Sequence, residues 1–332
     1  MVTLDDVARE AKVAKSTVSR ALNNPGRLNA GTQDHVRQVA DRLGYRALLG
    51  QRRSAPRAQP LALILPGLTN PYFFALMRGA EHGAAATGRS LLVVDSQHDA
   101  QREASQVERL AGSVSGFISA SSRLPPAKLR QLVSRHRVVL VNRQIPGVAS
   151  VVVDPVAGPV AALAHLVSLG HRDIAYLAAA GGPWTDLKRW NAVRGAGQAA
   201  GVAVRRLGPF QAETESGPAA ADALVSDGAT AAIAFNDLLA IGVLHRLRER
   251  GLSVPQDISV VGFDDVFGAS FCSPPLTTVA APLDDLGRAA VGLLIEHEEP
   301  GWAPRSLVLP AHLVVRTSTG PALAATLASG SG

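Results

Sequence analysis

Two short helical patterns joined by a tight turn, within residues 3–24, constrain the fold more than any other feature of this chain. In the first pattern, Leu4, Val7 and Ala8 have the i, i+3, i+4 spacing of one helix face. The same spacing returns over residues 18–22, where Val, Ala and Leu occupy the corresponding positions. The sequence therefore predicts a helix-turn-helix; the alternative is a small amphipathic helical hairpin without that role.

The second of these helices leaves small and cationic side chains facing outward. Lys15, Ser16, Ser19 and Arg20 lie off its apolar face. Such a helix can enter the major groove of DNA and contact base edges and phosphates. Thr3 stands where the N-cap of the first helix is expected. We therefore expect the second helix to be the one that meets DNA.

All of the excess positive charge falls in the same region. The chain has 33 Lys and Arg against 27 Asp and Glu, a net charge of +6. Residues 1–60 hold eleven basic and five acidic residues, whereas the rest of the chain holds 22 of each. Cations gathered in this way gain from phosphate contact and counterion release. Double-stranded DNA is therefore the predicted partner of the N-terminal segment.

The predicted headpiece is completed by a third helix over about residues 30–43, with Asn29 as its cap and Gly44 at its end. Three helices then occupy residues 1–45. Residues 46–60 change character and are rich in Arg and Pro, a composition typical of a linker.

From residue 61 onward, short apolar runs alternate with helical patterns. Each run is bounded by Gly, Pro, Asp or Asn, as expected of a parallel strand buried on both faces. The predicted strands are Leu61–Leu65, Leu91–Val94, Gly116–Ser119, Val138–Val141, Ile174–Leu177, Ala231–Phe235, Ile258–Gly262 and Leu313–Arg316. The predicted helices include Tyr72–Thr87, Pro155–Leu169, Asp237–Arg250 and Leu283–His297. The pattern predicts two doubly wound α/β lobes with parallel sheets and a ligand cleft between them.

Polar side chains follow several of the predicted strands at their carboxyl ends. They are Asn70, Asn142, Arg143, Asn236, Asp237, Asp264 and Asp265. Arg189 lies in a loop-to-helix region near Trp184 and Trp190. Carboxylate and amide groups, an arginine fork and an aromatic face suit a small polyol or sugar. For Asp237 or Asp264 alone the alternative is a helix cap or a surface charge, but together these residues predict a ligand cleft.

Several other classes of protein are disfavoured by the sequence. It has no run of about 18 apolar residues for a membrane span, and no apolar signal core near Met1. A single cysteine, Cys272, fits a reducing cytosol, so we expect a cytoplasmic protein without disulfides. Glycine-rich nucleotide loops and the nucleophile elbow are missing, and His165 and His171 are not spaced to share a metal. We therefore expect no cofactor, no metal and no enzymatic activity.

Motifs in both regions point to one family. The headpiece motifs are Thr3-Leu-Asp-Asp-Val-Ala and Ser16-Thr-Val-Ser-Arg-Ala-Leu-Asn. The core motifs are Asn70-Pro-Tyr-Phe, His165-Leu-Val-Ser-Leu-Gly-His-Arg-Asp-Ile-Ala, Asn236-Asp-Leu-Leu-Ala-Ile-Gly, Val254-Pro-Gln-Asp-Ile-Ser-Val-Val-Gly-Phe-Asp-Asp, Pro275-Leu-Thr-Thr-Val and Val315-Arg-Thr-Ser-Thr-Gly. With these motifs, in this order from about Val2 to Gly320, the sequence resembles the LacI/GalR family of bacterial transcriptional regulators.

The resemblance implies a homodimer that binds a near-palindromic operator and has a core like that of periplasmic sugar-binding proteins. A ligand in the cleft, a sugar or sugar derivative by resemblance, would change the spacing of the two headpieces. The DNA-binding residues are then expected to be Thr3, Lys15, Ser16, Thr17, Ser19, Arg20, Asn23 and Asn29. The effector-binding residues are expected to be Phe74, Asn142, Trp184, Arg189, Asp237 and Asp264.

Three positions depart from the family pattern. Ala14 stands where the family usually has a Ser as N-cap of the recognition helix. Ser54 stands where a Leu usually enters the minor groove. Either Leu48 or Leu49 takes its place, or the hinge contacts phosphates only. Asn142 replaces an Asp, a change that bears on effector preference.

These observations divide the chain into a headpiece (1–45), a linker (46–60), a two-lobe core for effector binding and dimerisation (61–320) and a tail (321–332). The favoured function is a ligand-responsive repressor of sugar or related catabolic genes. The alternatives are a sugar-binding component of a transport system, disfavoured by the basic headpiece, and an enzyme, for which no catalytic pair is visible.

Overall fold

The computed structural model describes residues 2–23, 28–45 and 58–322. The chain divides into two units, Met1–Ala58 and Gln59–Gly332. The predicted linker lies outside the described residues except for its last three positions, and so do Leu48, Leu49 and Ser54; the same holds for the tail from residue 323 onward. None of the helices in the described ranges is long and apolar enough to cross a membrane.

The first unit contains three helices around a small apolar core. They are α1 (Leu4–Glu10), α2 (Lys15–Asn23) and α3 (Ala30–Arg42). Buried apolar residues from all three helices, such as Val7, Val18 and Val36, form that core. The periodic positions that predicted the helices are therefore the positions that hold them together.

The helix termini of this unit differ in how they are capped. Thr3 caps α1 in a reciprocal capping box with Asp6, and Asn29 caps α3 by accepting a hydrogen bond from the Thr32 amide at 2.7 Å. At the start of α2, the Ala14 carbonyl accepts the amides of Thr17 and Val18, but an alanine side chain has no oxygen to offer. The helix that was predicted to meet DNA thus begins without a side-chain cap.

The second unit is built on two six-stranded sheets. Its strands are β1 (Leu61–Leu65), β2 (Leu91–Asp95), β3 (Gly116–Ala120), β4 (Val138–Val141), β5 (Ser150–Val153), β6 (Asp173–Ala179), β7 (Ala203–Phe210), β8 (Ala231–Ala234), β9 (Ser259–Phe263), β10 (Thr277–Ala280), β11 (Ser306–Leu309) and β12 (His312–Val314). The strand orders are β11-β5-β4-β3-β1-β2 and β12-β10-β9-β8-β6-β7. All pairings are parallel except that of β12 with β10.

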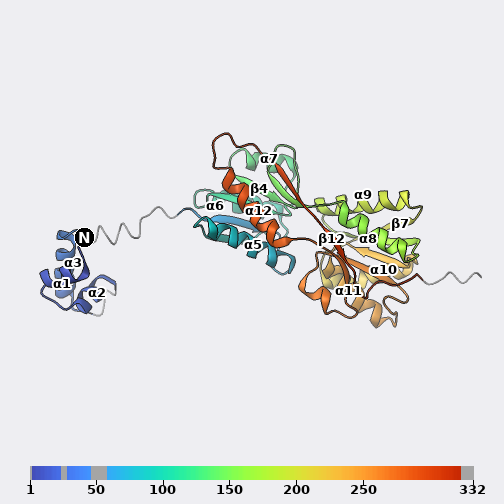
Figure 1. Cartoon of the computed structure of the whole chain (residues 1–332), viewed down its shortest axis with the longest axis horizontal. Coiled ribbons are helices and arrows are strands. Elements are labelled where there is room, and N and C mark those ends of the chain that lie inside the picture. The colour runs from blue at the N-terminus through green and yellow to red at the C-terminus, as the bar shows by residue number, and fades with distance from the viewer. Residues whose placement is uncertain (1, 24–27, 46–57, 323–332) are drawn as a thin grey trace, which may run out of the picture. The chain divides into compact units, whose positions relative to one another are not determined.

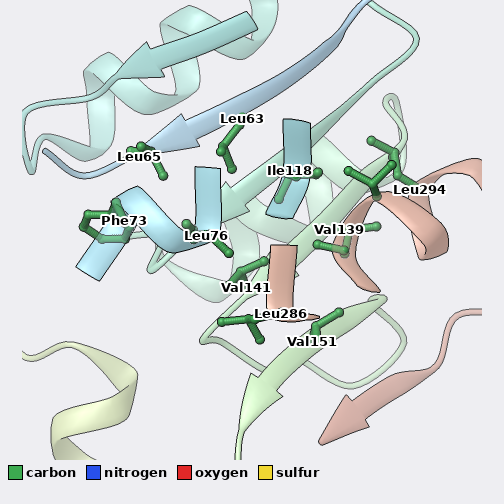
Figure 2. Packing of buried hydrophobic residues seen from close by; sticks show 14 of the residues in the cluster. Leu63, Leu65, Phe73, Leu76, Ile118, Val139, Val141, Val151, Leu286 and Leu294 are labelled. Atoms are coloured by element: carbon green, nitrogen blue, oxygen red, sulfur yellow. The ribbon is translucent and has the colours of Figure 1, made fainter. Parts of the chain in front are cut away.

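Helices cover both faces of each sheet. They are α5 (Tyr72–Ala86), α6 (Ala100–Leu110), α7 (Pro126–Val133), α8 (Ala157–Ser168), α9 (Trp184–Ala199), α10 (Gly217–Asp227), α11 (Asp237–Glu249) and α12 (Leu283–Glu296), with short 3-10 turns at Thr214–Ser216 and Phe267–Ser270. In the first lobe, Leu63 of β1 packs with α5 and α12 on one face (Figure 2). Ile64 packs with α6 and α7 on the other face. The second sheet is covered by α10 and α11 on one face and α8 and α9 on the other.

The chain crosses from one lobe to the other three times. After β5 the chain enters the second lobe, returns after β10 to form α12 and β11 of the first lobe, and crosses again to β12 (Figure 1). α12 lies directly against α5, because Gly79 and Gly287 let the two backbones meet; a Cβ on either glycine would collide with the other helix. Three adjacent crossings suit a hinge between the lobes.

The prediction of two doubly wound lobes is confirmed, but four strands were missed and one was misjudged. β5, β7, β10 and β11 were not predicted. The last predicted strand, Leu313–Arg316, was expected to be parallel; the structure places a shorter strand, His312–Val314, antiparallel at the sheet edge. An edge strand is free to run in either direction because it has one neighbour, and apolar content alone does not reveal its direction.

Candidate functional site

The first candidate site is the outward face of α2. Lys15, Ser16 and Arg20 are exposed, and Thr17 and Ser19 are half-buried. The ammonium group of Lys15 lies 2.7 Å from the Asp5 carboxylate, an exposed pair of small energetic value that a phosphate can replace.

Arg20 has no acidic partner among the residues that the structure describes. A free guanidinium on an exposed helix can donate two parallel hydrogen bonds to a guanine edge or to a phosphate.

Two other predicted DNA-binding residues act first as caps. The Thr3 hydroxyl donates to the Asp6 carboxylate at 2.7 Å, and the Asn29 side chain accepts from the Thr32 amide. Asn23 ends α2, and its side chain lies outside what the structure describes. The exposed side chains of α2 therefore form the centre of this surface.

The second candidate site is a cavity of about 330 Å³ between the two lobes. It lies beyond the carboxyl ends of parallel strands from both sheets, where doubly wound folds bind ligands. The first lobe contributes Pro66, Gly67, Thr69, Asn70, Tyr72, Phe73, His98, Ser121, Arg123 and Asn142. The second lobe contributes Ala180, Gly181, Pro183, Thr185, Arg189, Gln211, Ala212, Glu213, Phe235, Asn236, Leu238 and Asp264.

A buried ion pair forms the second-lobe wall. Arg189 Nη2 lies 3.3 Å from the Asp264 carboxylate, and Nη1 donates to the Phe235 carbonyl at 2.5 Å. The guanidinium also lies over the rings of Phe263 and Phe235, at 4.2 and 5.1 Å from their centroids. These contacts hold the arginine fork in one orientation.

Asp264 is unusual in both its backbone conformation and the burial of its carboxylate. Its backbone is left-handed, with φ of 105°, and its side chain is largely removed from water. Burial raises the pKa of Asp264 to about 6 despite the opposing charge of Arg189. Strained and perturbed residues of this kind cluster at binding sites.

On the first-lobe wall, Asn142 and Tyr72 are joined by a hydrogen bond. The Asn142 amide donates to the Tyr72 hydroxyl at 2.5 Å, and both residues are buried. Burial, and secondarily the Asp264 charge, raises the pKa of Tyr72. The phenol therefore stays protonated and its proton is available to a ligand oxygen.

The structure brings three of the six predicted effector residues to the cavity, namely Asn142, Arg189 and Asp264, and places the other three elsewhere. Phe74 is 54% exposed on the outer side of α5, while its neighbour Phe73 lines the cavity. Successive helix residues point about 100° apart, so one of the two faces inward and the other outward.

Asp237 and Trp184 also lie outside the lining of this cavity. Asp237 is fully buried below the cavity, where it accepts hydrogen bonds from the Thr278 hydroxyl at 2.6 Å and the Val266 amide at 2.8 Å. Trp184 lines a separate surface hollow, because it precedes Arg189 by five residues and so points about 140° away on α9.

Sequence reasoning also missed several lining residues. Phe73 and Phe235 lie next to residues that had been singled out, so a shift of one position would have found them, whereas Asn70 and Asn236, which had been singled out as strand-end residues, do line the cavity. His98 and Arg123 follow β2 and β3, both of which were predicted, so a systematic search of strand ends would have found them. Gln211 and Glu213 follow the unpredicted β7 and gave no signal.

These two sites together define a class of protein: a DNA-binding helical headpiece attached to a two-lobe ligand-binding core. Residues 3–47 match the description "Bacterial regulatory proteins, lacI family", and residues 163–319 match "Periplasmic binding protein-like domain". The HTH-type transcriptional regulator DegA of Bacillus subtilis (strain 168) is 33% identical over 342 residues, covering 96% of this chain and 98% of DegA.

Solved structures agree along almost the whole chain. A complex of the transcriptional regulator CelR with cellobiose has a TM-score of 0.71 and 27% identity, covering 96% of this chain and 100% of that chain. The lac repressor dimer bound to operator and the anti-inducer ONPF has a TM-score of 0.74 and 25% identity, covering 96% and 99%. This chain belongs to the lacI family of bacterial regulatory proteins, and it is a ligand-responsive, DNA-binding transcriptional regulator.

Proposed function

We propose that the protein is a repressor that binds a near-palindromic operator as a homodimer, and that a sugar or sugar derivative in the interlobe cavity changes its affinity for that operator. The single observation that supports this most is the cavity itself. It is lined by both lobes, so a ligand that contacts both walls stabilises one lobe arrangement over others.

The chemistry of the walls fits a polyhydroxylated ligand. Arg189 and Asp264 offer donors and acceptors to neighbouring hydroxyls, and Asn142 lies on the opposite lobe. The rings of Phe73 and Phe235 offer apolar faces for the C–H side of a sugar. CelR, which has the same fold, is described in complex with cellobiose.

The headpiece proposal rests on the exposed face of α2. Lys15, Ser16, Thr17, Ser19 and Arg20 are the side chains we assign to DNA. Thr3, Asn23 and Asn29 remain candidates for phosphate contacts at the edges of that face. The basic headpiece also disfavours a transport component, which has no use for such a surface.

The dimer proposal rests on apolar side chains exposed at the surface of the core. Phe267 and Phe271 pack edge to face with 4.8 Å between ring centroids, yet they are 81% and 63% exposed. Two exposed adjacent aromatics are typical of a surface covered by another chain. The lac repressor with the same fold is described as a dimer on its operator, and residues 61–320 would provide the dimer contacts here.

The test is fluorescence anisotropy with DNA from the promoter region beside the protein's own gene, with and without a panel of sugars. We expect tight, salt-dependent binding that one ligand shifts. Unchanged binding with every sugar would contradict the assigned effector class, and no binding in any condition would contradict the DNA-binding role.

A further inference from the structure

The first-lobe wall of the cavity has an excess of positive charge. The side chains of Arg123 and Arg143 both lie close enough to the Glu103 carboxylate for its charge to act on them. Glu103 is 3% exposed, and its two oxygens accept hydrogen bonds from the Ser119 hydroxyl at 2.7 Å and from the Arg123 backbone amide at 3.1 Å. One carboxylate therefore faces two guanidinium groups, which leaves one cation without an equal and opposite charge.

That cation is Arg123, because it is the one of the two that lines the cavity. The Arg143 guanidinium donates to the Ser122 carbonyl at 2.5 Å within its own lobe. Arg123 Nη1 instead reaches across to the carbonyls of Ala180 and Gly181 in the second lobe, at 3.4 and 3.0 Å. Neutral carbonyls are weak partners for a guanidinium compared with an anion.

The Arg123 side chain is also incompletely satisfied. Its Nε atom is buried and has no hydrogen-bond partner among the described residues. Burial lowers the pKa of Arg123, and the nearby Glu103 charge opposes that shift without cancelling it. A buried donor without an acceptor is costly, so a shift of the side chain that brings this donor to a ligand oxygen would be favoured.

The charges of neighbouring groups determine which kind of ligand Arg123 can bind. His98 lies close to Arg123, and burial together with the Arg123 charge lowers the His98 pKa, so the imidazole is neutral at pH 7 and can donate one hydrogen bond. Two carboxylates act on His98, namely Asp95 at the end of β2 and Glu213 in the second lobe; Glu213 is exposed and Asp95 is half-buried, so water partly screens both charges. The Arg189–Asp264 pair on the far wall is neutral overall.

We infer that the effector carries an anionic oxygen group, a carboxylate or a phosphate, and that Arg123 binds this group at the first-lobe wall. This inference rests on the proposed function, since it describes the ligand of the same cavity. The polyol part of the ligand would lie towards Arg189 and Asp264, and its anionic group would take the donors that Arg123 now shares with two carbonyls. Arg123 would thus select sugar acids or sugar phosphates over neutral sugars.

The experiment is isothermal titration calorimetry on the full chain with matched probes. These are glucose against glucuronate, galactose against galacturonate, and glucose against glucose 6-phosphate. We expect an acidic member to bind more tightly than its neutral counterpart. The uronates and the phosphate distinguish the two sources of anionic charge. If every neutral sugar binds at least as tightly as its acid, or if no acid binds, the inference is wrong.

Variants assign the effect to one side chain. We expect Arg123→Gln to weaken binding of the acidic probe by roughly 10- to 100-fold, the range for a hydrogen bond to a charged group, while the neutral sugar changes little. Arg123→Lys should recover part of the preference, and Glu213→Gln should strengthen binding of the acid. Arg143→Gln is the matched control, since the Glu103 charge also acts on Arg143, which does not line the cavity. Equal losses for Arg123→Gln and Arg143→Gln would contradict direct contact.

Failure of the inference can be separated from failure of the proposed function. Anisotropy with promoter DNA on the same samples reports DNA binding independently of ligand chemistry. A protein that binds DNA and responds to a neutral sugar alone would retain the proposed function and overturn this inference.

Discussion

The headpiece surface and the interlobe cavity hold their arginines in opposite ways. On α2, Arg20 is exposed and no acidic side chain among the described residues pairs with it. In the cavity, Arg189 is largely buried, paired with Asp264 and packed against two aromatic rings. An exposed cation suits a polyanion such as DNA, whose binding then depends on salt. A buried, oriented pair suits a small ligand that must be recognised by direction as well as by charge.

The largest effect should come from substitution of the exposed arginine. Arg20→Ala should weaken operator binding by about 2–6 kcal/mol, because a contact of about 1–3 kcal/mol is lost in each half of a dimer. The unfolding temperature should stay the same, since Arg20 packs against nothing in the core. Anisotropy at fixed salt measures the effect, with Arg102→Ala on α6 as an exposed control. Wild-type affinity in the Arg20 variant would contradict the docking of α2.

Substitution of the buried arginine should weaken ligand binding without changing operator affinity. Arg189→Gln should weaken ligand binding by about 1.5–3 kcal/mol, since a charge-assisted hydrogen bond is lost. Operator affinity without ligand should be unchanged. Calorimetry and anisotropy on one preparation test this, and Arg194→Gln, an exposed arginine on the same helix, is the control. A normal ligand response would show that the second-lobe wall has been wrongly assigned.

The ionised Asp264 carboxylate should lower stability when no ligand is bound. Its folded pKa of about 6 exceeds the unfolded value of about 3.9. The stabilising contribution is therefore complete below about pH 4 and is lost as the pH rises through 6. Asp264→Asn should stabilise the ligand-free protein by about 2 kcal/mol at pH 7.5 and far less at pH 4.5. Thermal unfolding at both pH values checks this; equal shifts would mean that the pKa is not raised.

The smallest predicted effect lies at the start of α2. Ala14→Ser should stabilise the headpiece by about 1 kcal/mol, because a serine hydroxyl at the N-cap can accept a hydrogen bond from a backbone amide in the first turn of α2. At present the amides of Thr17 and Val18 donate to the Ala14 carbonyl. Hydrogen exchange of the α2 amides would report the change, with Lys12→Ser as a nearby substitution outside the cap position. An unaltered exchange rate would mean that α2 is already fully ordered.

The headpiece could be predicted from sequence because its information is local. The spacing of Leu4, Val7 and Ala8 defines a helix face without knowledge of any distant residue. The first strands of the core were equally legible, since Leu61–Leu65 is apolar throughout and buried on both faces. Strand β7 was not, because it includes Arg205 and Arg206 and shows no continuous apolar run.

The cavity lining was only partly predictable, because a shift of one position along the chain decides whether a side chain faces the cavity. Asn236 and Asp237 are adjacent and both polar, yet Asn236 lines the cavity while Asp237 turns beneath it to bind Thr278 and the Val266 amide. Sequence shows that polar groups gather at strand ends. It does not show which of two neighbours faces the ligand, because that depends on where each helix begins relative to its strand.

A ligand in the cavity should control DNA binding, and the reciprocity of the two binding equilibria gives the sharpest test of that coupling. Once a ligand is found, its dissociation constant should be measured by calorimetry with and without saturating operator. We predict that operator changes ligand affinity by the same factor as ligand changes operator affinity, as linkage requires. An identical ligand dissociation constant in both conditions would show that the cavity and the headpiece are not coupled.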